Sequence, residues 1–168
     1  MRIERLGIGG ALLAMALATL PVAARSADLP PLPPLDHFMV AISVADLEAE
    51  TAWYVEKLGF AVERDVELGD GRIFFRWLTR GNERIELVHS PTAAPGTPRP
   101  LPPAHAGLHG LTHLTLETAD LAATRAALAA RGVTPVMDIT TVKELGISVL
   151  YLRDPEGNYV EIVERLKN

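Results

Sequence analysis

The chain has 168 residues, of which 48% are hydrophobic and 22% charged, and this length and composition are typical of one globular domain with its own core. The formal net charge of −5 and an aromatic content of only 5% exclude the basic, aromatic surface on which nucleic-acid-binding proteins depend. The absence of cysteine excludes disulfides, thiolate chemistry and a lipid anchor attached through cysteine.

Residues 1–27 have the layout of a secretory signal peptide. Two arginines precede an apolar run over residues 11–20, and small residues follow at 22–24, where signal peptidase reads the chain. Because the run is short for a bilayer crossing, a retained membrane anchor is the less favoured alternative. We expect cleavage near residue 24 or 27, location in the periplasm or outside the cell, no stable membrane anchor after cleavage, and a stiff proline-rich leader over residues 28–34.

The remaining residues, 35–168, contain one pattern twice. The stretches "LDHFMVAISVADLEAETAWYVEKLGF" and "LTHLTLETADLAATRAALAARGV" both read as Leu-x-His, an apolar strand, Ala-Asp-Leu, a helix and a glycine. We predict that Asp46 and Asp120 cap the N-termini of the two helices and that Gly59 and Gly132 end them.

Three strands are expected after each helix, so each half reads β-α-β-β-β. A Pro/Gly/Ala linker over residues 91–110 is expected to have no regular structure, and it divides a single domain into module one at 35–90 and module two at 111–168. The predicted fold is α+β, with two paired modules whose helices lie outside and whose sheet faces form a cup-shaped or barrel-like mixed β-sheet. The expected strands are Phe60–Leu68, Arg72–Arg80, Arg84–His89, Val133–Val142, Ile147–Arg153 and Tyr159–Glu164.

Histidine and glutamate recur at matched positions of the two modules. His37 and His113 open the first strand of each module, while Glu86 and Glu161 lie in the last strand. Across a pseudo-twofold axis these four side chains could converge on one point. Imidazole nitrogens and carboxylate oxygens suit one divalent ion such as Zn, Ni, Co, Mn or Fe(II), and four protein ligands leave positions open for water or substrate.

A plainer interpretation stays open for each of these residues taken alone. A single histidine on a strand is more often exposed or hydrogen bonded than a ligand, and a lone acid in a short strand often faces water. The recurrence of the same His and Glu pattern at matched places favours the metal site.

The repeated pattern resembles the vicinal oxygen chelate superfamily, which includes glyoxalase I, bleomycin-resistance proteins and extradiol dioxygenases. The matching stretches are "LDHFMVAISVADLEAETAWYVEKLGF", "RIELVH", "GLTHLTLETADL" and "LRDPEGNYVEIVE", which together span residues 35–164. The resemblance implies a metal held by His37, Glu86, His113 and Glu161.

The resemblance also implies a metal-dependent, glyoxalase-like isomerase or lyase acting on a small substrate through bidentate oxygen coordination and enolate stabilisation. Glu161 or Glu86 would act as the catalytic base. An extradiol-type ring-cleaving dioxygenase and a non-catalytic small-molecule (antibiotic) binding protein are the alternatives. A homodimer is possible, and the site could form within one chain or across two.

Two further residues are candidates for substrate contact. If Ile73, Phe75 and Trp77 pack on the helix, Arg76 would point into the cup and could meet an anionic substrate. Tyr151 occupies the equivalent strand of module two. Arg76 as a solvated surface residue is the plainer alternative. His105 and His109 lie in the linker, where a lid or ordinary loop histidines are both consistent with the sequence.

Overall fold

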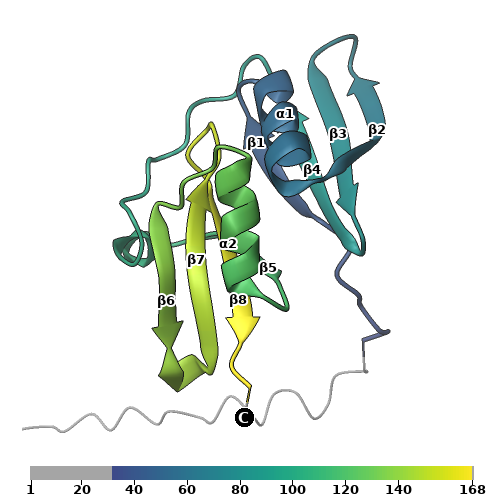
Figure 1. The fold of residues 1–168 in the computed structure, drawn as a ribbon. Coiled ribbons are helices and arrows are strands. Elements are labelled where there is room, and N and C mark those ends of the chain that lie inside the picture. Colours follow the sequence, from purple (N-terminus) through teal and green to yellow (C-terminus); the bar gives the residue numbers. More distant parts are fainter. Residues whose placement is uncertain (1–31, 168) are drawn as a thin grey trace, which may run out of the picture. The chain divides into compact units, whose positions relative to one another are not determined.

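The computed structural model describes residues 32–167, so the predicted signal peptide at 1–27 lies outside the described residues. From His37 onward the chain forms the two expected β-α-β-β-β modules (Figure 1). Module one consists of β1 (Val40–Val44), α1 (Leu47–Leu58), β2 (Ala61–Leu68), β3 (Ile73–Arg80) and β4 (Glu83–His89). Module two consists of β5 (Leu114–Glu117), α2 (Leu121–Ala130), β6 (Met137–Val142), β7 (Ile147–Arg153) and β8 (Tyr159–Arg165), with 3-10 turns at Ala104–Gly107 (η2) and Lys143–Leu145 (η3).

Each module contains one four-stranded mixed sheet. The strand orders are β1-β4-β3-β2 and β5-β8-β7-β6, in which the first strand runs parallel to the last and the other pairs are antiparallel. The predicted α+β architecture is confirmed, but the two sheets are not closed into a barrel. The linker also differs from the prediction, because η2 gives it one turn of regular structure.

The ends of the helices are set by the residues that the sequence indicates. Asp46 Oδ1 accepts the backbone N–H groups of Glu48 at 3.1 Å and Ala49 at 2.9 Å, and Asp120 Oδ1 accepts that of Ala123 at 2.8 Å. These bonds satisfy backbone donors that have no partner within a helix. Gly59 ends α1 with φ 74°, a left-handed conformation that glycine adopts without steric cost.

One apolar cluster connects the helix-covered faces of the two sheets. It includes Tyr54 and Leu87 from module one and Leu121, Leu150 and Val160 from module two, all almost fully buried. Burial of apolar surface is the main force that holds the modules together. Over residues 32–167, no helix has the length and apolar character needed to cross a membrane.

A polar junction also joins the modules, at the turn between β7 and β8. Glu156 in this turn accepts hydrogen bonds through Oε1 from the backbone N–H groups of Ala45 and Asp46. Its own N–H donates to Glu50 Oε1 at 2.8 Å, and Tyr54 Oη donates to Asp154 Oδ2 at 3.4 Å. The turn therefore anchors module two at the start of α1.

Glu50 is fully buried at this junction, and its Oε2 has no hydrogen-bond partner within residues 32–167. Burial, reinforced by the nearby Asp154 carboxylate, raises the pKa of Glu50 to about 8. Below that pH the side chain is neutral, which avoids the large cost of a buried unpaired charge.

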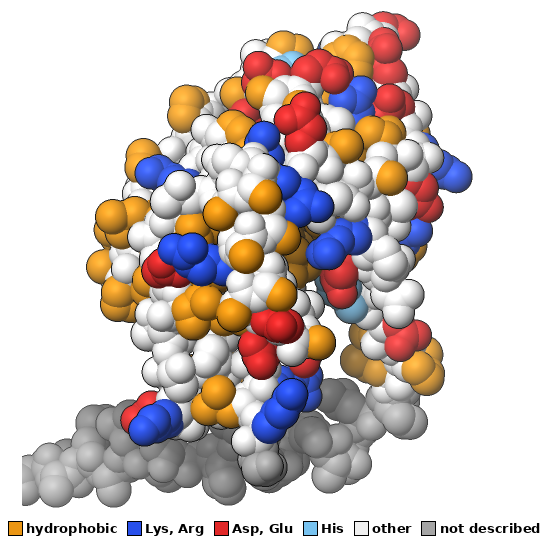
Figure 2. All heavy atoms as spheres, viewed as in Figure 1, with side chains coloured by type: hydrophobic (Ala, Val, Ile, Leu, Met, Phe, Trp, Pro, Cys, Tyr) orange, Lys and Arg blue, Asp and Glu red, His pale blue; other side chains and the backbone are white. Residues whose placement is uncertain are grey.

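The helix-bearing face of the molecule has a mixed charge. Acidic and basic side chains are interspersed over the face that carries α1 and α2 (Figure 2). This mixture leaves that face without a strong electrostatic field of one sign.

Candidate metal site

Two of the four predicted ligands lie side by side in module two. His113 directly precedes β5, and Glu161 lies in β8, the strand that pairs with β5 opposite Thr115. The distance from His113 Nε2 to Glu161 Oε2 is 3.4 Å. Thr115 Oγ1 donates to the same carboxylate oxygen at 2.9 Å, and Tyr151 Oη donates to Glu161 Oε1. The carboxylate is therefore held at both oxygens.

The electrostatics of this pair suit metal coordination. Partial burial lowers the pKa of His113, an effect that outweighs the opposite influence of Glu161, while the nearby His105 lowers it further. At neutral pH the imidazole is therefore neutral, as a metal ligand must be. The His113 and Glu161 side chains are 22% and 12% exposed, so both are accessible from solvent.

The spacing of the pair also fits a divalent ion. Ligand–metal distances of about 2.0–2.2 Å place two adjacent ligand atoms about 3 Å apart on one ion. The separation of 3.4 Å between His113 Nε2 and Glu161 Oε2 is close to that value. A nitrogen and an oxygen donor therefore form half of the predicted ligand set.

The other half is not joined to this pair within one chain. Glu86 lies in β4, and His37 is exposed ahead of β1. Within residues 32–167, no three His, Asp or Glu side chains gather closely enough to hold an ion. One chain brings together His113 and Glu161 but does not bring His37 and Glu86 to them.

Each glutamate is held by the aromatic residue opposite it in the neighbouring strand. Trp77 in β3 pairs with Glu86 in β4, and Trp77 Nε1 donates to Glu86 Oε1 at 2.8 Å. Tyr151 in β7 pairs with Glu161 in β8 and donates to it in the same way. The two modules thus repeat an acid and its aromatic donor at matched register positions. The prediction that Trp77 packs on the helix excludes this bond, so the sequence did not indicate the partnership.

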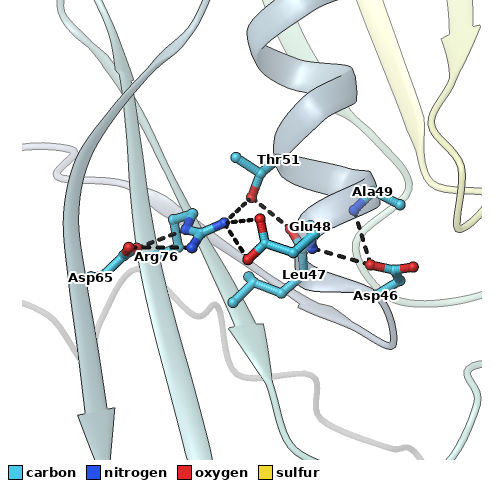
Figure 3. A network of polar contacts seen from close by, with 7 residues as sticks. All are labelled: Asp46, Leu47, Glu48, Ala49, Thr51, Asp65 and Arg76. Carbon is cyan, nitrogen blue, oxygen red and sulfur yellow. Dashed lines mark hydrogen bonds and ion pairs between the residues drawn. The ribbon is translucent and has the colours of Figure 1, made fainter.

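The predicted face of Arg76 is wrong. Arg76 points toward α1, where Nη1 contacts both carboxylate oxygens of Glu48 at 3.0 Å and the hydroxyl of Thr51 at 3.0 Å (Figure 3). Its Nε donates to Asp65 Oδ1 at 2.7 Å. Leu78, on the same side of β3 as Arg76, is fully buried in the core, so this side faces the helix and Trp77 lies on the other face.

Tyr151, the second predicted substrate residue, lies at the candidate site. Its hydroxyl donates to Glu161, and burial followed by that carboxylate raises the pKa of Tyr151 above its usual range. The phenol therefore stays protonated at neutral pH and remains a hydrogen-bond donor. Its contact with a substrate stays a prediction.

The bond between Tyr151 and Glu161 can be tested through stability. We expect Tyr151→Phe to lower the free energy of unfolding by about 2 kcal/mol, because a hydrogen bond to a charged group is lost. Tyr159→Phe serves as the matched control, since Tyr159 Oη donates to the neutral carbonyl of Pro100 at 3.1 Å, and should cost about 1 kcal/mol. Urea titrations measure both values. A Tyr151→Phe variant with the same free energy of unfolding as the wild type would contradict the hydrogen bond from Tyr151 to Glu161.

His105 is a site residue that the sequence analysis left as an ordinary linker histidine or part of a lid. It lies in η2, is only 4% exposed, and its Nε2 is 3.0 Å from His113 Nδ1. Its ring meets Tyr151 edge-on with centroids 5.2 Å apart. Its spacing of eight residues from His113 across a Pro/Gly-rich segment carries no regular periodicity, so no sequence signal indicated the contact.

A cavity of about 370 Å³ adjoins His113. It is bounded by β1, the linker and the turn between β7 and β8, and its charged lining side chains are Arg99, Arg153 and Glu156. A volume of this size is sufficient for a small ligand. His113 is shared by the cavity and the candidate metal site.

Comparisons with known proteins agree with this architecture. A model of the Glyoxalase/Bleomycin resistance protein/Dioxygenase superfamily matches residues 35–162. The structure of a glyoxalase family protein from Enterococcus faecalis is similar, with 26% sequence identity, a TM-score of 0.63, and coverage of 77% of this chain and 97% of that one. No curated protein matches the chain significantly.

Two more distant structures are similar in fold. An antibiotic binding protein from a Streptomyces species shares 23% identity with a TM-score of 0.59, over 80% of this chain and 99% of that one. A glyoxalase I mutant from Zea mays shares 17% identity with a TM-score of 0.59, over 77% of this chain and 46% of that one. At these identities the likeness shows the fold alone.

Proposed function

Because the chain belongs to the glyoxalase/bleomycin resistance protein/dioxygenase superfamily, we propose that it is a metal-dependent, glyoxalase-like isomerase or lyase acting on a small substrate. The observation that supports this proposal most directly is the repeated pair of a glutamate and its aromatic donor, Glu86 with Trp77 and Glu161 with Tyr151. The same acid and donor at matched positions of both sheets support a shared role for the two carboxylates.

The proposed ligands are His37, Glu86, His113 and Glu161. A divalent ion held there would supply Lewis acidity to two adjacent substrate oxygens and so stabilise a developing enolate. Hydrogen bonds from Thr115 and Tyr151 orient the Glu161 carboxylate. Glu161 or Glu86 accepts the proton that is removed next to the substrate carbonyl.

We propose that two copies of the chain complete the site, with His37 and Glu86 of one copy meeting His113 and Glu161 of the other. The sheet of module one presents a partly exposed apolar face around Glu86, where Ile73 and Val66 are both 37% exposed and Phe38 is 55% exposed. Apolar surface of this kind is a common feature of the core of homodimer interfaces.

The alternatives differ in their metal content. A ring-cleaving dioxygenase would hold iron and would have no need of Glu86 as a fourth ligand. An antibiotic-binding function, suggested by the similar Streptomyces protein, would need no metal. The presence of all four candidate ligands favours the enzyme.

Elemental analysis of the chain, purified without chelator or affinity-tag metal, tests the proposal. We expect close to one divalent ion per four-ligand set, which is two ions per dimer, and we expect light scattering to show the dimer. The ion should be lost in His113→Ala. His109→Ala, which changes an exposed linker histidine, should retain it. Nickel, zinc or cobalt would support the isomerase or lyase, and iron the dioxygenase. A metal-free protein that cannot be reloaded would overturn the enzyme in favour of ligand binding.

A further inference from the structure

The linker segment around His105 is built to hold that one side chain in place. Arg99 Nη1 donates to the carbonyl oxygens of His105 at 3.0 Å and Leu108 at 2.8 Å, and Arg99 Nη2 donates to that of His109 at 3.2 Å. Tyr159 Oη in turn donates to the carbonyl of Pro100 at 3.1 Å. Because one guanidinium binds three carbonyl oxygens between His105 and His109, it fixes the backbone that carries His105.

The ring of His105 is equally constrained. It packs edge-on against Tyr151 and Tyr159, with centroids 5.2 and 5.4 Å apart, and it is 4% exposed. Its Nε2 meets His113 Nδ1 at 3.0 Å, whereas its buried Nδ1 has no hydrogen-bond partner in the described part of the chain. The single polar contact of this buried ring is therefore a proposed metal ligand.

We infer that His105 is a positioning residue, which sets the nitrogen of His113 that carries the proton. This inference rests on the proposed metal site. A hydrogen bond between two neutral imidazoles allows two arrangements, each with one proton per ring. In the first, His105 Nε2–H donates to His113 Nδ1, and His113 Nε2–H points at Glu161 Oε2, 3.4 Å away.

In the second arrangement both rings have changed tautomer and no proton is gained or lost. His113 Nδ1–H donates to His105 Nε2, His105 carries its proton on Nδ1, and His113 Nε2 presents its lone pair. Only this arrangement lets His113 Nε2 bind an ion beside Glu161. The ion-free protein favours the first arrangement, because the buried and unpartnered Nδ1 of His105 then carries a lone pair instead of an unpaired N–H donor.

The first test follows the nitrogen shifts of the His113 ring by ¹⁵N NMR at a pH where both imidazoles are neutral. The ion-free wild-type protein should show one tautomer with the proton on Nε2, and zinc should move the proton to Nδ1. Averaged shifts for His113 in the ion-free wild-type protein would overturn the inference without any variant being needed.

The second test compares two substitutions. His105→Phe keeps the ring between the two tyrosines but removes the donor to His113 Nδ1, so ion-free His113 should show averaged tautomers. It also removes the acceptor for His113 Nδ1–H in the zinc-binding arrangement, so zinc should bind 10- to 100-fold more weakly. His105→Gln can still accept or donate and should restore binding to within about threefold. His109→Gln should change neither measurement. An unchanged His113 tautomer and zinc affinity in folded His105→Phe would overturn the inference.

These readouts separate the two proposals. A fixed His113 tautomer that is lost in His105→Phe, in a wild-type protein that binds no zinc, would uphold the role of His105 and overturn the metal-dependent function. Zinc binding that is identical in wild type and His105→Phe would do the reverse.

Discussion

A Glu161→Gln variant is expected to fold as the wild type does but to bind a divalent ion at least about 100-fold more weakly and to lose turnover. The amide is neutral and a poor ligand, yet its oxygen can still accept the hydrogen bond from Tyr151, so the fold should be retained. Competition with a chromophoric chelator measures the affinity, and circular dichroism confirms the fold.

Arg80→Gln is the matched control for this experiment. Arg80 is exposed and forms no ion pair among residues 32–167, so its loss should leave metal binding unchanged. Full metal occupancy in Glu161→Gln would show that Glu161 is not a ligand. It would also contradict the proposal that Glu86 and Glu161 hold the metal as a matched pair.

The buried Glu50 should make the protein less stable as the pH rises. Its pKa of about 8 in the folded chain lies above the ordinary value of 4.5, so the folded state binds the proton more tightly than the unfolded state. The stabilisation is complete below about pH 4.5 and is lost as the pH rises through about 8. Ionised Glu50 would face the carboxylates of Asp46, Asp154 and Glu156 and the hydroxyl of Tyr54.

A Glu50→Gln variant is neutral at every pH and should remove most of this dependence. Between pH 5 and pH 9 we expect the free energy of unfolding of the wild type to fall by several kcal/mol, with an upper limit of ~5 kcal/mol. The variant should stay nearly constant and be the more stable protein at pH 9. Urea titrations at four pH values measure this, with exposed Glu144→Gln as control. A wild-type stability that does not fall over this range would contradict the buried neutral acid.

Local patterns predicted the framework well. Asp46, Asp120 and Gly59 cap their helices as expected, because capping depends only on a residue and the few that follow it. β7, at Ile147–Arg153, has the predicted bounds, since its continuous apolar run ends there at the Asp-Pro-Glu-Gly turn.

The face of β3 could not be predicted in the same way. Its sequence "IFFRWLTR" places apolar residues on both sides, so alternation alone does not decide which side meets α1. Burial of Leu78, on the same side of β3 as Arg76, turns that side toward the core and the helix, where Glu48 and Thr51 then bind Arg76. The error at Arg76 therefore also concealed the bond between Trp77 and Glu86.

The sequence by itself determined the two modules, their helix ends and the repeated histidine and glutamate positions, because propensity, capping and periodicity act over a few neighbouring residues. Only the tertiary structure decided that Trp77 and Tyr151 hold the two acids, that His105 contacts His113, and that Glu50 is buried against the turn at Glu156. Each of those contacts depends on how two segments pack, and packing is set by the burial of whole surfaces rather than by any local pattern.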